Sequence, residues 1–211
     1  MDISNLKGAI GCVSAAMADN RDYLIELDQR NGDGDLGISM SEGYNAIFSF
    51  LDESPETDLG KALMRCSSIF NESAPSTLGT ITSIFLLAMA KSLKGKTHAN
   101  LSELVAAMQS GVAMVMEKAK AKPGEKTILD SISPAVQALA DHAGEGTRAA
   151  FAHAAEAAAR GSDSTKEMRS VHGRAAYYGD KSIGIVDGGA VVGKILFESL
   201  CEYVAWEPGM K

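Results

Sequence analysis

Apolar residues recur at helical spacing through almost the whole of this 211-residue chain. The first stripe follows steps of three, four and seven, as one face of a helix requires, and consists of Ile10, Val13, Met17, Leu24 and Leu27. Strand-like alternation is absent except for a short stretch at 183–186. With 45% hydrophobic residues the chain can bury a full core. The pattern therefore predicts an all-α protein of about eight helices.

Start and stop signals place several of these helices. Ser54 and Pro55 predict the N-cap and first turn of a helix that runs to about Phe70. Asn100, with Glu103 three residues later, forms a capping box ahead of a long amphipathic helix. Three more helices are predicted by the nearly uncharged segment 76–93, the Ala-rich segment 147–160 and the apolar segment 191–203. No repeat or linker divides the chain, so we expect one domain over residues 1–211.

Charge and composition exclude several classes of protein. A net charge of −7 argues against a nucleic-acid partner, because phosphate backbones are met by clustered Lys and Arg. Three widely spaced cysteines predict neither a disulfide framework nor a zinc site. His98, His142, His153 and His172 have no partner motif and are expected to be structural or exposed. Without a signal peptide, and with no apolar run near the ~20 residues of a membrane helix, we expect a cytoplasmic protein that does not insert into a membrane.

Two connections are long for a compact helical domain, residues 28–38 and 161–189. Long ordered loops in such domains usually serve a function. The second contains several glycines together with Arg169, Arg174, Lys181 and Asp187. It is predicted to form a lid.

The first connection brings three carboxylates together, those of Asp28, Asp33 and Asp35, among three glycines. A calcium EF-hand does not fit, because its first and last ligand positions would fall on Gln29 and Met40. An all-oxygen set suits a hard cation such as Mg²⁺, which completes its shell with phosphate and water. The helix that follows would also point free N–H groups at an anion. From these residues alone, a metal–phosphate site and a solvated acidic turn stay equally open.

Three motifs, in order along the chain, carry a resemblance. They are LDQRNGDGDLG at 27–37, PGEKTILD at 123–130, and GRAAYYGDKSIG at 173–184 followed by DGGA at 187–190. Together they resemble the dihydroxyacetone kinase L-subunit family, whose later motifs read PGDKTM-x-D and GRASYLGERSIG…DPGA. The resemblance implies an antiparallel barrel of eight helices with the nucleotide site at one end.

The resemblance also assigns roles to residues. Asp28, Asp33 and Asp35 match three aspartates that bind two Mg²⁺ ions bridging the phosphates of ADP or ATP. Arg174 matches a lid arginine near the phosphates that would stabilise charge in the transition state. These four are the expected catalytic residues. The other expected nucleotide contacts are Gly37, Ile38, Ser39, Ser76, Thr77, Ile128, Asp187, Gly188 and Gly189.

Three features depart from the family pattern. Leu36 stands where the family usually has His, and Gly188 replaces the proline of DPGA. Residues 72–77, Glu-Ser-Ala-Pro-Ser-Thr, replace a stretch rich in glycine and serine. Ser76 and Thr77 would then supply hydroxyl groups to the phosphates, while Glu72 would bring negative charge toward them if it points inward.

For function, the resemblance implies the Mg-dependent nucleotide-binding subunit of a dihydroxyacetone-type kinase. This phosphotransferase subunit would pass a phosphoryl group to a ketose held on a separate K-type subunit. The donor would be ATP, or a phosphotransferase-system protein that rephosphorylates retained ADP. The alternative is a non-catalytic, nucleotide-binding regulatory paralogue that docks a partner protein. A homodimer is compatible with either reading.

Overall fold

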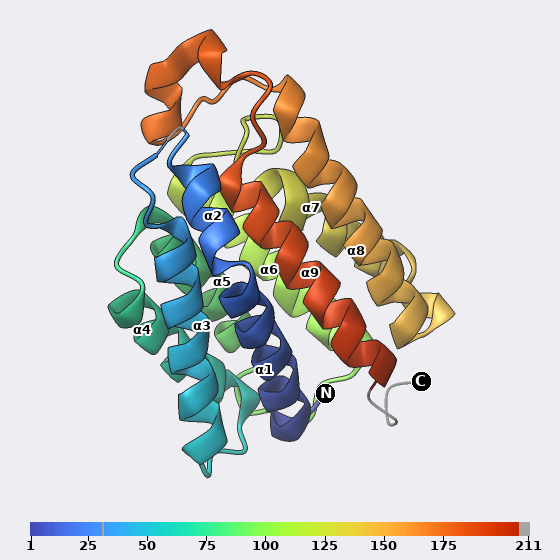
Figure 1. The fold of residues 1–211 in the computed structure, drawn as a ribbon. Helices are drawn as coiled ribbons and strands as arrows, with labels where there is room; N and C mark the ends of the chain where they lie inside the picture. Colours follow the sequence, from blue (N-terminus) through green and yellow to red (C-terminus); the bar gives the residue numbers. More distant parts are fainter. Residues whose placement is uncertain (31, 207–211) are drawn as a thin grey trace.

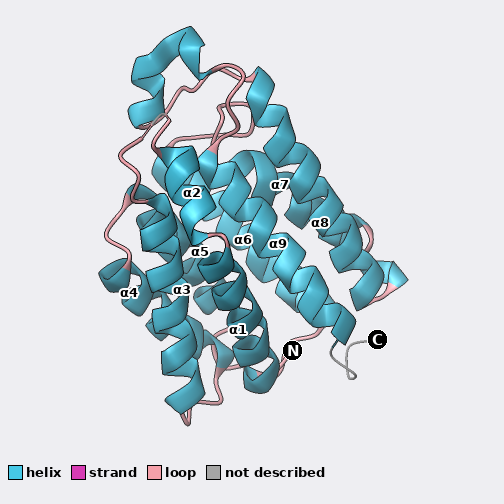
Figure 2. Ribbon diagram, viewed as in Figure 1, coloured by secondary structure: helices cyan, strands magenta, loops and turns pink. Residues whose placement is uncertain are grey.

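The computed structural model describes residues 1–30 and 32–206, which contain nine α-helices, three 3₁₀ segments and no strand (Figures 1 and 2). The helices are α1 (Ile3–Asp19), α2 (Arg21–Asp28), α3 (Leu36–Glu53), α4 (Leu59–Ser73), α5 (Thr77–Ser92), α6 (Leu101–Ala119), α7 (Leu129–Asp141), α8 (Thr147–Ser164) and α9 (Gly188–Trp206). The 3₁₀ segments are η1 (Ala143–Glu145), η2 (Thr165–Glu167) and η3 (Arg174–Ser182). The all-α prediction is confirmed, and 183–186 is not a strand.

The helices pack side by side in chain order. α1 packs against α3, each helix from α3 to α8 packs against the next, and α9 contacts both α8 and α1. This order of contacts closes a ring (Figure 1). No helix in the described part of the chain is long and apolar enough to cross a membrane.

The first helical stripe is broken at Asn20, where the sequence predicts one continuous helix. Asn20 ends α1 and precedes α2, and its side-chain amide donates to the carbonyl oxygen of Ala16 at 2.9 Å. Asparagine side chains compete in this way with the hydrogen bonds of the helix itself. The break accounts for the ninth helix, because α2 prolongs the stripe that begins in α1.

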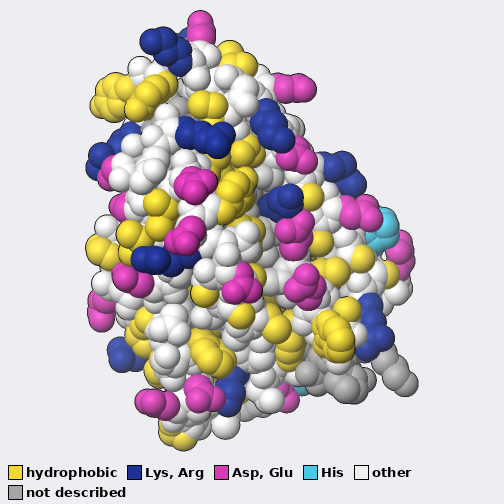
Figure 3. Space-filling model, viewed as in Figure 1, with side chains coloured by type: hydrophobic (Ala, Val, Ile, Leu, Met, Phe, Trp, Pro, Cys, Tyr) yellow, Lys and Arg dark blue, Asp and Glu magenta, His cyan; other side chains and the backbone are white. Residues whose placement is uncertain are grey.

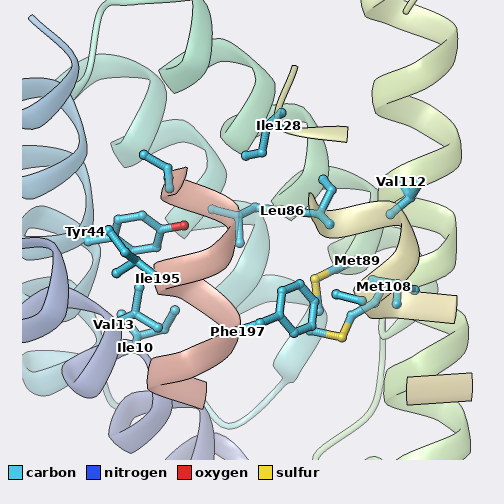
Figure 4. Close-up of a cluster of buried hydrophobic side chains, with 14 of the residues drawn as sticks. Ile10, Val13, Tyr44, Leu86, Met89, Met108, Val112, Ile128, Ile195 and Phe197 are labelled. Atoms are coloured by element: carbon cyan, nitrogen blue, oxygen red, sulfur yellow. The ribbon is translucent and has the colours of Figure 1, made fainter. Parts of the chain in front are cut away.

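The apolar stripes face the centre of the ring. Figure 4 shows side chains from α1, α3, α5, α6 and α9 converging there, among them Ile10, Tyr44, Leu86, Met108 and Phe197. The ring of Tyr44 meets that of Phe70 edge-on, with centroids 5.0 Å apart. Burial of these groups supplies most of the stability that holds the helix ends in place.

Helix α7 is held tightly between α8 and α9 near the end where it begins. A Cβ at Gly161 of α8 would overlap the carbonyl oxygen of Asp130, and one at Gly193 of α9 would overlap the hydroxyl of Ser131. Both neighbours therefore approach the first turn of α7 more closely than a larger residue allows. The motif at 123–130 is thus anchored against two helices.

Two start signals have different outcomes. Asn100 and Glu103 form the predicted capping box, with both hydrogen bonds at 2.9 Å. The prediction at Ser54 is wrong, since Ser54 ends α3, and α4 begins only after Asp58, whose carboxylate accepts from the N–H of Lys61 at 3.1 Å. A residue before proline avoids the helical conformation, so Ser54 terminates one helix without starting the next.

Replacing Asn100 with Ala removes the cap of α6, which we expect to lower the free energy of unfolding by about 1 kcal/mol. Urea denaturation followed by circular dichroism measures the change. Ser110→Ala, an exposed position in the middle of the same helix, is the matched control and should lower stability by less. Equal losses in the two variants would show that the box does not stabilise α6.

Candidate active site

One end of the ring gathers the loop after α2, the start of α5, the turn before α7 and the long segment between α8 and α9. Figure 1 shows this last segment in orange, lying over the blue loop that joins α2 to α3. We call residues 165–187 the lid. Together these elements line a cavity of about 600 Å³. The predicted site residues can be placed relative to this cavity.

Asp28, Asp33 and Asp35 come together at the wall of the cavity, with one carboxylate oxygen of each within 4.8 Å of the others. The loop folds back because the carboxylate of Asp28 accepts from the N–H of Gly34 at 2.7 Å, and Gly34 adopts a φ of 80° that disfavours other residues. Partial burial raises the pKa of Asp35, and the charges of Asp33 and Asp28 raise it further. A hard divalent cation would relieve this repulsion, so the donor set fits Mg²⁺.

Arg174 reaches this cluster from the lid. Its guanidinium lies 2.8 Å from a carboxylate oxygen of Asp33, and the arginine side chain remains 70% exposed. An ion pair so open to solvent contributes at most about 1 kcal/mol. Arg174 can therefore exchange Asp33 for a phosphate at little cost.

The start of α5 opens onto the same cavity. Pro75, Ser76, Thr77 and Leu78 line it. The hydroxyl of Ser76 caps the helix by accepting from the N–H of Gly79 at 3.1 Å. The first N–H groups of a helix have no partner within it and attract anions. This end of α5 is therefore suited to phosphate, with Thr77 as the hydroxyl that the cap leaves available.

Glu72, which would repel phosphate if it pointed inward, is exposed and does not line the cavity. The remaining predicted contacts Ile128, Asp187, Gly188 and Gly189 do line it. The negative charge of Glu72, at the start of the divergent stretch 72–77, therefore lies outside the site.

Three predicted phosphate contacts, Gly37, Ile38 and Ser39, do not line the cavity. Gly37 packs against α2, where a Cβ would overlap the main-chain carbonyl of Arg21, and Ser39 is buried. A glycine at the start of α3 is explained by this close contact between helices. These three residues lie outside the cavity wall, which the start of α5 does line, and their contact with phosphate stays a prediction.

The two single-residue departures from the family pattern contact each other. Leu36 is buried at the cavity wall, and a Cβ at Gly188 would lie 2.6 Å from a methyl carbon of Leu36. The absence of a side chain at position 188 therefore makes room for leucine at position 36. With Ile128, this pair forms an apolar part of the wall.

Asp187 ties the lid to α9. Its carboxylate accepts from the N–H of Ala190 at 2.7 Å, and its own N–H donates to the hydroxyl of Thr165 at 2.9 Å. Burial raises the pKa of Asp187 to about 6 against the opposing effect of the Ala190 hydrogen bond. The charge of Asp130 raises this pKa further, while the nearby Lys126 lowers it. Asp187 therefore holds the base of the lid and ionises close to neutral pH.

Lys126 organises the lid, although no sequence pattern assigns a role to it. The carboxylate of Asp130 accepts from the N–H groups of Gly124 at 2.5 Å and Thr127 at 2.7 Å, forming a tight turn. Within this turn Lys126 adopts a φ of 60°, rare for a residue with a side chain. The turn directs the side chain of Lys126 under the lid.

The ammonium group of Lys126 donates to main-chain carbonyl oxygens from both ends of the lid. They belong to Thr165 at 2.8 Å, Met168 at 3.0 Å, Ser182 at 2.7 Å and Ile185 at 2.6 Å. The residue is 3% exposed, and burial lowers the pKa of its ammonium group. A buried charge requires such partners. The two chain segments that form the base of the lid are therefore fixed to the turn before α7. Helical periodicity carries no signal that would reveal a buried lysine.

His172, expected to be structural or exposed, connects the lid to the turn before α7 a second time. It lines the cavity, and its Nε2 lies 2.7 Å from a carboxylate oxygen of Glu125. Lys126 therefore holds the base of the lid, while His172 and Arg174 hold its tip against the rest of the site.

Comparisons with known proteins match this arrangement. A family model described as the DAK2 domain covers residues 31–202. The ADP-binding subunit DhaL of the PEP-dependent dihydroxyacetone kinase 2 from Listeria innocua is 30% identical over 196 residues, which are 90% of this chain and 89% of that protein. The corresponding Escherichia coli subunit is 29% identical over 171 residues, 80% of this chain and 81% of that one.

Larger proteins contain the same unit. The mouse triokinase/FMN cyclase is 32% identical over 184 residues, which are 86% of this chain but 32% of that protein. The crystal structure of the dihydroxyacetone kinase from C. freundii in complex with AMP-PNP and Mg²⁺ superposes with a TM-score of 0.75 and 25% identity, covering 93% of this chain and 33% of that one. The chain thus spans about a third of these proteins and nine-tenths of the Listeria subunit.

Lys126→Met tests how the lid is held. Without the ammonium group four carbonyl oxygens lose their donor, two of them in buried hydrogen bonds. We therefore expect amide hydrogen exchange in 165–185 to be at least about tenfold faster, equivalent to about 1.4 kcal/mol of easier opening. Lys181→Met, on the exposed part of the same lid, should leave exchange unchanged. Equal protection in both variants would contradict the anchoring role.

Asp187→Asn tests the raised pKa. In the folded protein the carboxyl group binds its proton more tightly, so the stability it contributes is complete below pH 3.8 and is lost as pH rises through about 6. Asparagine cannot ionise. Between pH 4 and pH 7 the free energy of unfolding of the variant should therefore rise relative to that of the native protein, by at most about 3 kcal/mol. Denaturation at each pH, without nucleotide, measures this gain. Parallel stability curves would contradict it, as would the same gain in the exposed control Asp180→Asn.

Proposed function

Because the chain belongs to the DAK2 domain family, which includes the DhaL subunits of dihydroxyacetone kinases, we propose that it is the nucleotide-binding subunit of such a kinase. One observation carries the proposal: three carboxylates, a lid arginine and the start of a helix meet around one cavity. Each of these groups suits a metal–phosphate ligand, and no other site in the described residues combines them.

The three aspartates would hold Mg²⁺, two ions in the complete site, as their all-oxygen donor set suits. When bound, the metal supplies neutralisation of the phosphate oxygens and fixes their orientation. The chain offers no nucleophile here and needs none, because phosphoryl transfer depends mainly on positioning and charge stabilisation.

The protein's own residues would act around the phosphates. Arg174 leaves Asp33 and stabilises the charge of the transferred group, while the N–H groups at the start of α5 and the hydroxyl of Thr77 hold the other phosphates. The lid, fixed at its base by Lys126, excludes water from them. Leu36 and Ile128 give the nucleotide an apolar surface to lie against.

The proposal extends to a partner and a substrate. A chain that covers nine-tenths of a DhaL subunit would work as a single domain of 1–211 in the cytoplasm, with a ketose such as dihydroxyacetone held on a separate K-type subunit. Apolar groups stand out at the tip of the lid (Figure 3), where Tyr177 is 93% exposed. They would give that subunit a contact close to the phosphates. The donor would be ATP, or retained ADP rephosphorylated by a phosphotransferase-system protein.

Thermal denaturation with ADP or ATP, with and without Mg²⁺, tests nucleotide binding. We expect the melting temperature to rise only when both are present, and the rise to disappear in Asp33→Asn, which keeps the shape of the side chain but removes its charge. Asp180→Asn, an exposed aspartate of the lid, should keep the full rise. The same rise in Asp33→Asn would refute the metal assignment.

Turnover is tested by adding a K-type subunit and dihydroxyacetone to the nucleotide-loaded protein. Formation of dihydroxyacetone phosphate from ATP, or from phosphoenolpyruvate with the phosphotransferase proteins, is the expected result. Nucleotide binding without product, over several K-type subunits and ketoses, would contradict the kinase function and favour a regulatory role.

A further inference from the structure

A second cluster of metal-binding side chains lies far from the lid, where α7 ends and α8 begins. It consists of His142, Glu145 and His153, and one ligand atom of each lies within 4.8 Å of the others. Figure 1 places this turn, coloured yellow to gold, at the opposite end of α7 and α8 from the lid. The proposed kinase function uses none of these residues.

The local fold explains why the three side chains meet. His142 follows the last turn of α7, and Glu145 ends η1, with its N–H bonded to the carbonyl oxygen of His142 at 3.0 Å. Gly146 then adopts a φ of 96°, which reverses the chain so that α8 returns along α7. His153 lies in the second turn of α8, and its imidazole stacks on that of His142 with centroids 3.7 Å apart.

The distances are close to those of a metal site. Nδ1 of His142 lies 2.7 Å from one carboxylate oxygen of Glu145, and Nε2 of His153 lies 3.5 Å from the other. Ligands at about 2.0–2.1 Å from a tetrahedral ion are separated by about 3.3 Å. Small side-chain rotations would therefore bring all three atoms onto one ion.

Charge and access also favour a cation here. Glu145 brings a negatively charged carboxylate to the cluster. The C-terminal end of α7 adds partial negative charge. The three side chains are 34%, 53% and 42% exposed, which leaves the remaining coordination positions to water.

We propose that His142, Glu145 and His153 form a surface site for a transition-metal ion of the zinc class. Two imidazole nitrogens and a carboxylate oxygen are the donor set that such ions prefer, whereas Mg²⁺ prefers oxygen alone. The protein thus carries two cation sites separated by chemistry, one of three aspartates and one with two histidines. A bound ion would join the end of α7 to the second turn of α8.

The test is titration of the full chain with Zn²⁺ by calorimetry, with excess Mg²⁺ present to occupy the aspartates. One Zn²⁺ per chain is expected. The double variant His142→Gln/His153→Gln should bind it more weakly by over about 100-fold, because even outer-shell partners of a metal account for 10–100-fold.

Another imidazole provides the control. His98 lies 3.5 Å from the N-terminal amino group, a pair that would also attract Zn²⁺, and His98→Gln should leave the main binding step unchanged. Circular dichroism and ADP affinity show whether each variant is folded. Equal Zn²⁺ affinity in the double variant and the native protein, or loss of the step in His98→Gln, would overturn the proposal.

Replacing Zn²⁺ with Co²⁺ gives a second readout. Visible absorption bands from nitrogen coordination should appear in the native protein and in His98→Gln, and not in the double variant. A spectrum identical to that of aqueous Co²⁺ in the native protein would likewise overturn the site.

Discussion

A buried ammonium group, that of Lys126, donates to carbonyl oxygens from both ends of the lid, and the form of the site follows from it. Because a buried charge cannot leave its partners without a large desolvation penalty, the base of the lid moves only with the turn before α7. Asp130 holds this turn through its hydrogen bonds, and the close packing of α7 against α8 and α9 fixes its position. Motion is left to the tip, where Arg174 forms an exposed ion pair that is easily exchanged.

Next to this fixed base, groups that attract a cation lie beside groups that attract an anion. Asp28, Asp33 and Asp35 crowd together, and their mutual repulsion falls when a cation lies between them. Arg174 and the start of α5 face the same space and attract anions. Cation and anion sites side by side are what a metal–nucleotide complex requires. The contact between Leu36 and Gly188 shows that the departures from the family pattern change the wall of the cavity without closing it.

The sequence predicted well what depends on neighbours along the chain and less well what depends on packing. The helical class, the capping box at Asn100 and the aspartate cluster follow from local spacing. For Gly37 the sequence does not decide, because a glycine at a helix start serves a phosphate contact or a helix contact equally well. Lys126 was missed because its burial arises from a turn with positive φ. The meeting of His142 and His153 depends on the reversal at Gly146, which the spacing of the two histidines does not reveal.

The central claim, that the three aspartates bind the metal of a nucleotide complex, is tested most directly by a crystal structure with ADP and Mn²⁺ in place of Mg²⁺. Anomalous difference density identifies manganese independently of the coordinates. We expect a peak about 2.1 Å from carboxylate oxygens of Asp28, Asp33 and Asp35, with the phosphates between it and the start of α5. Ordered ADP with no anomalous peak at these aspartates, or manganese bound elsewhere, would contradict it.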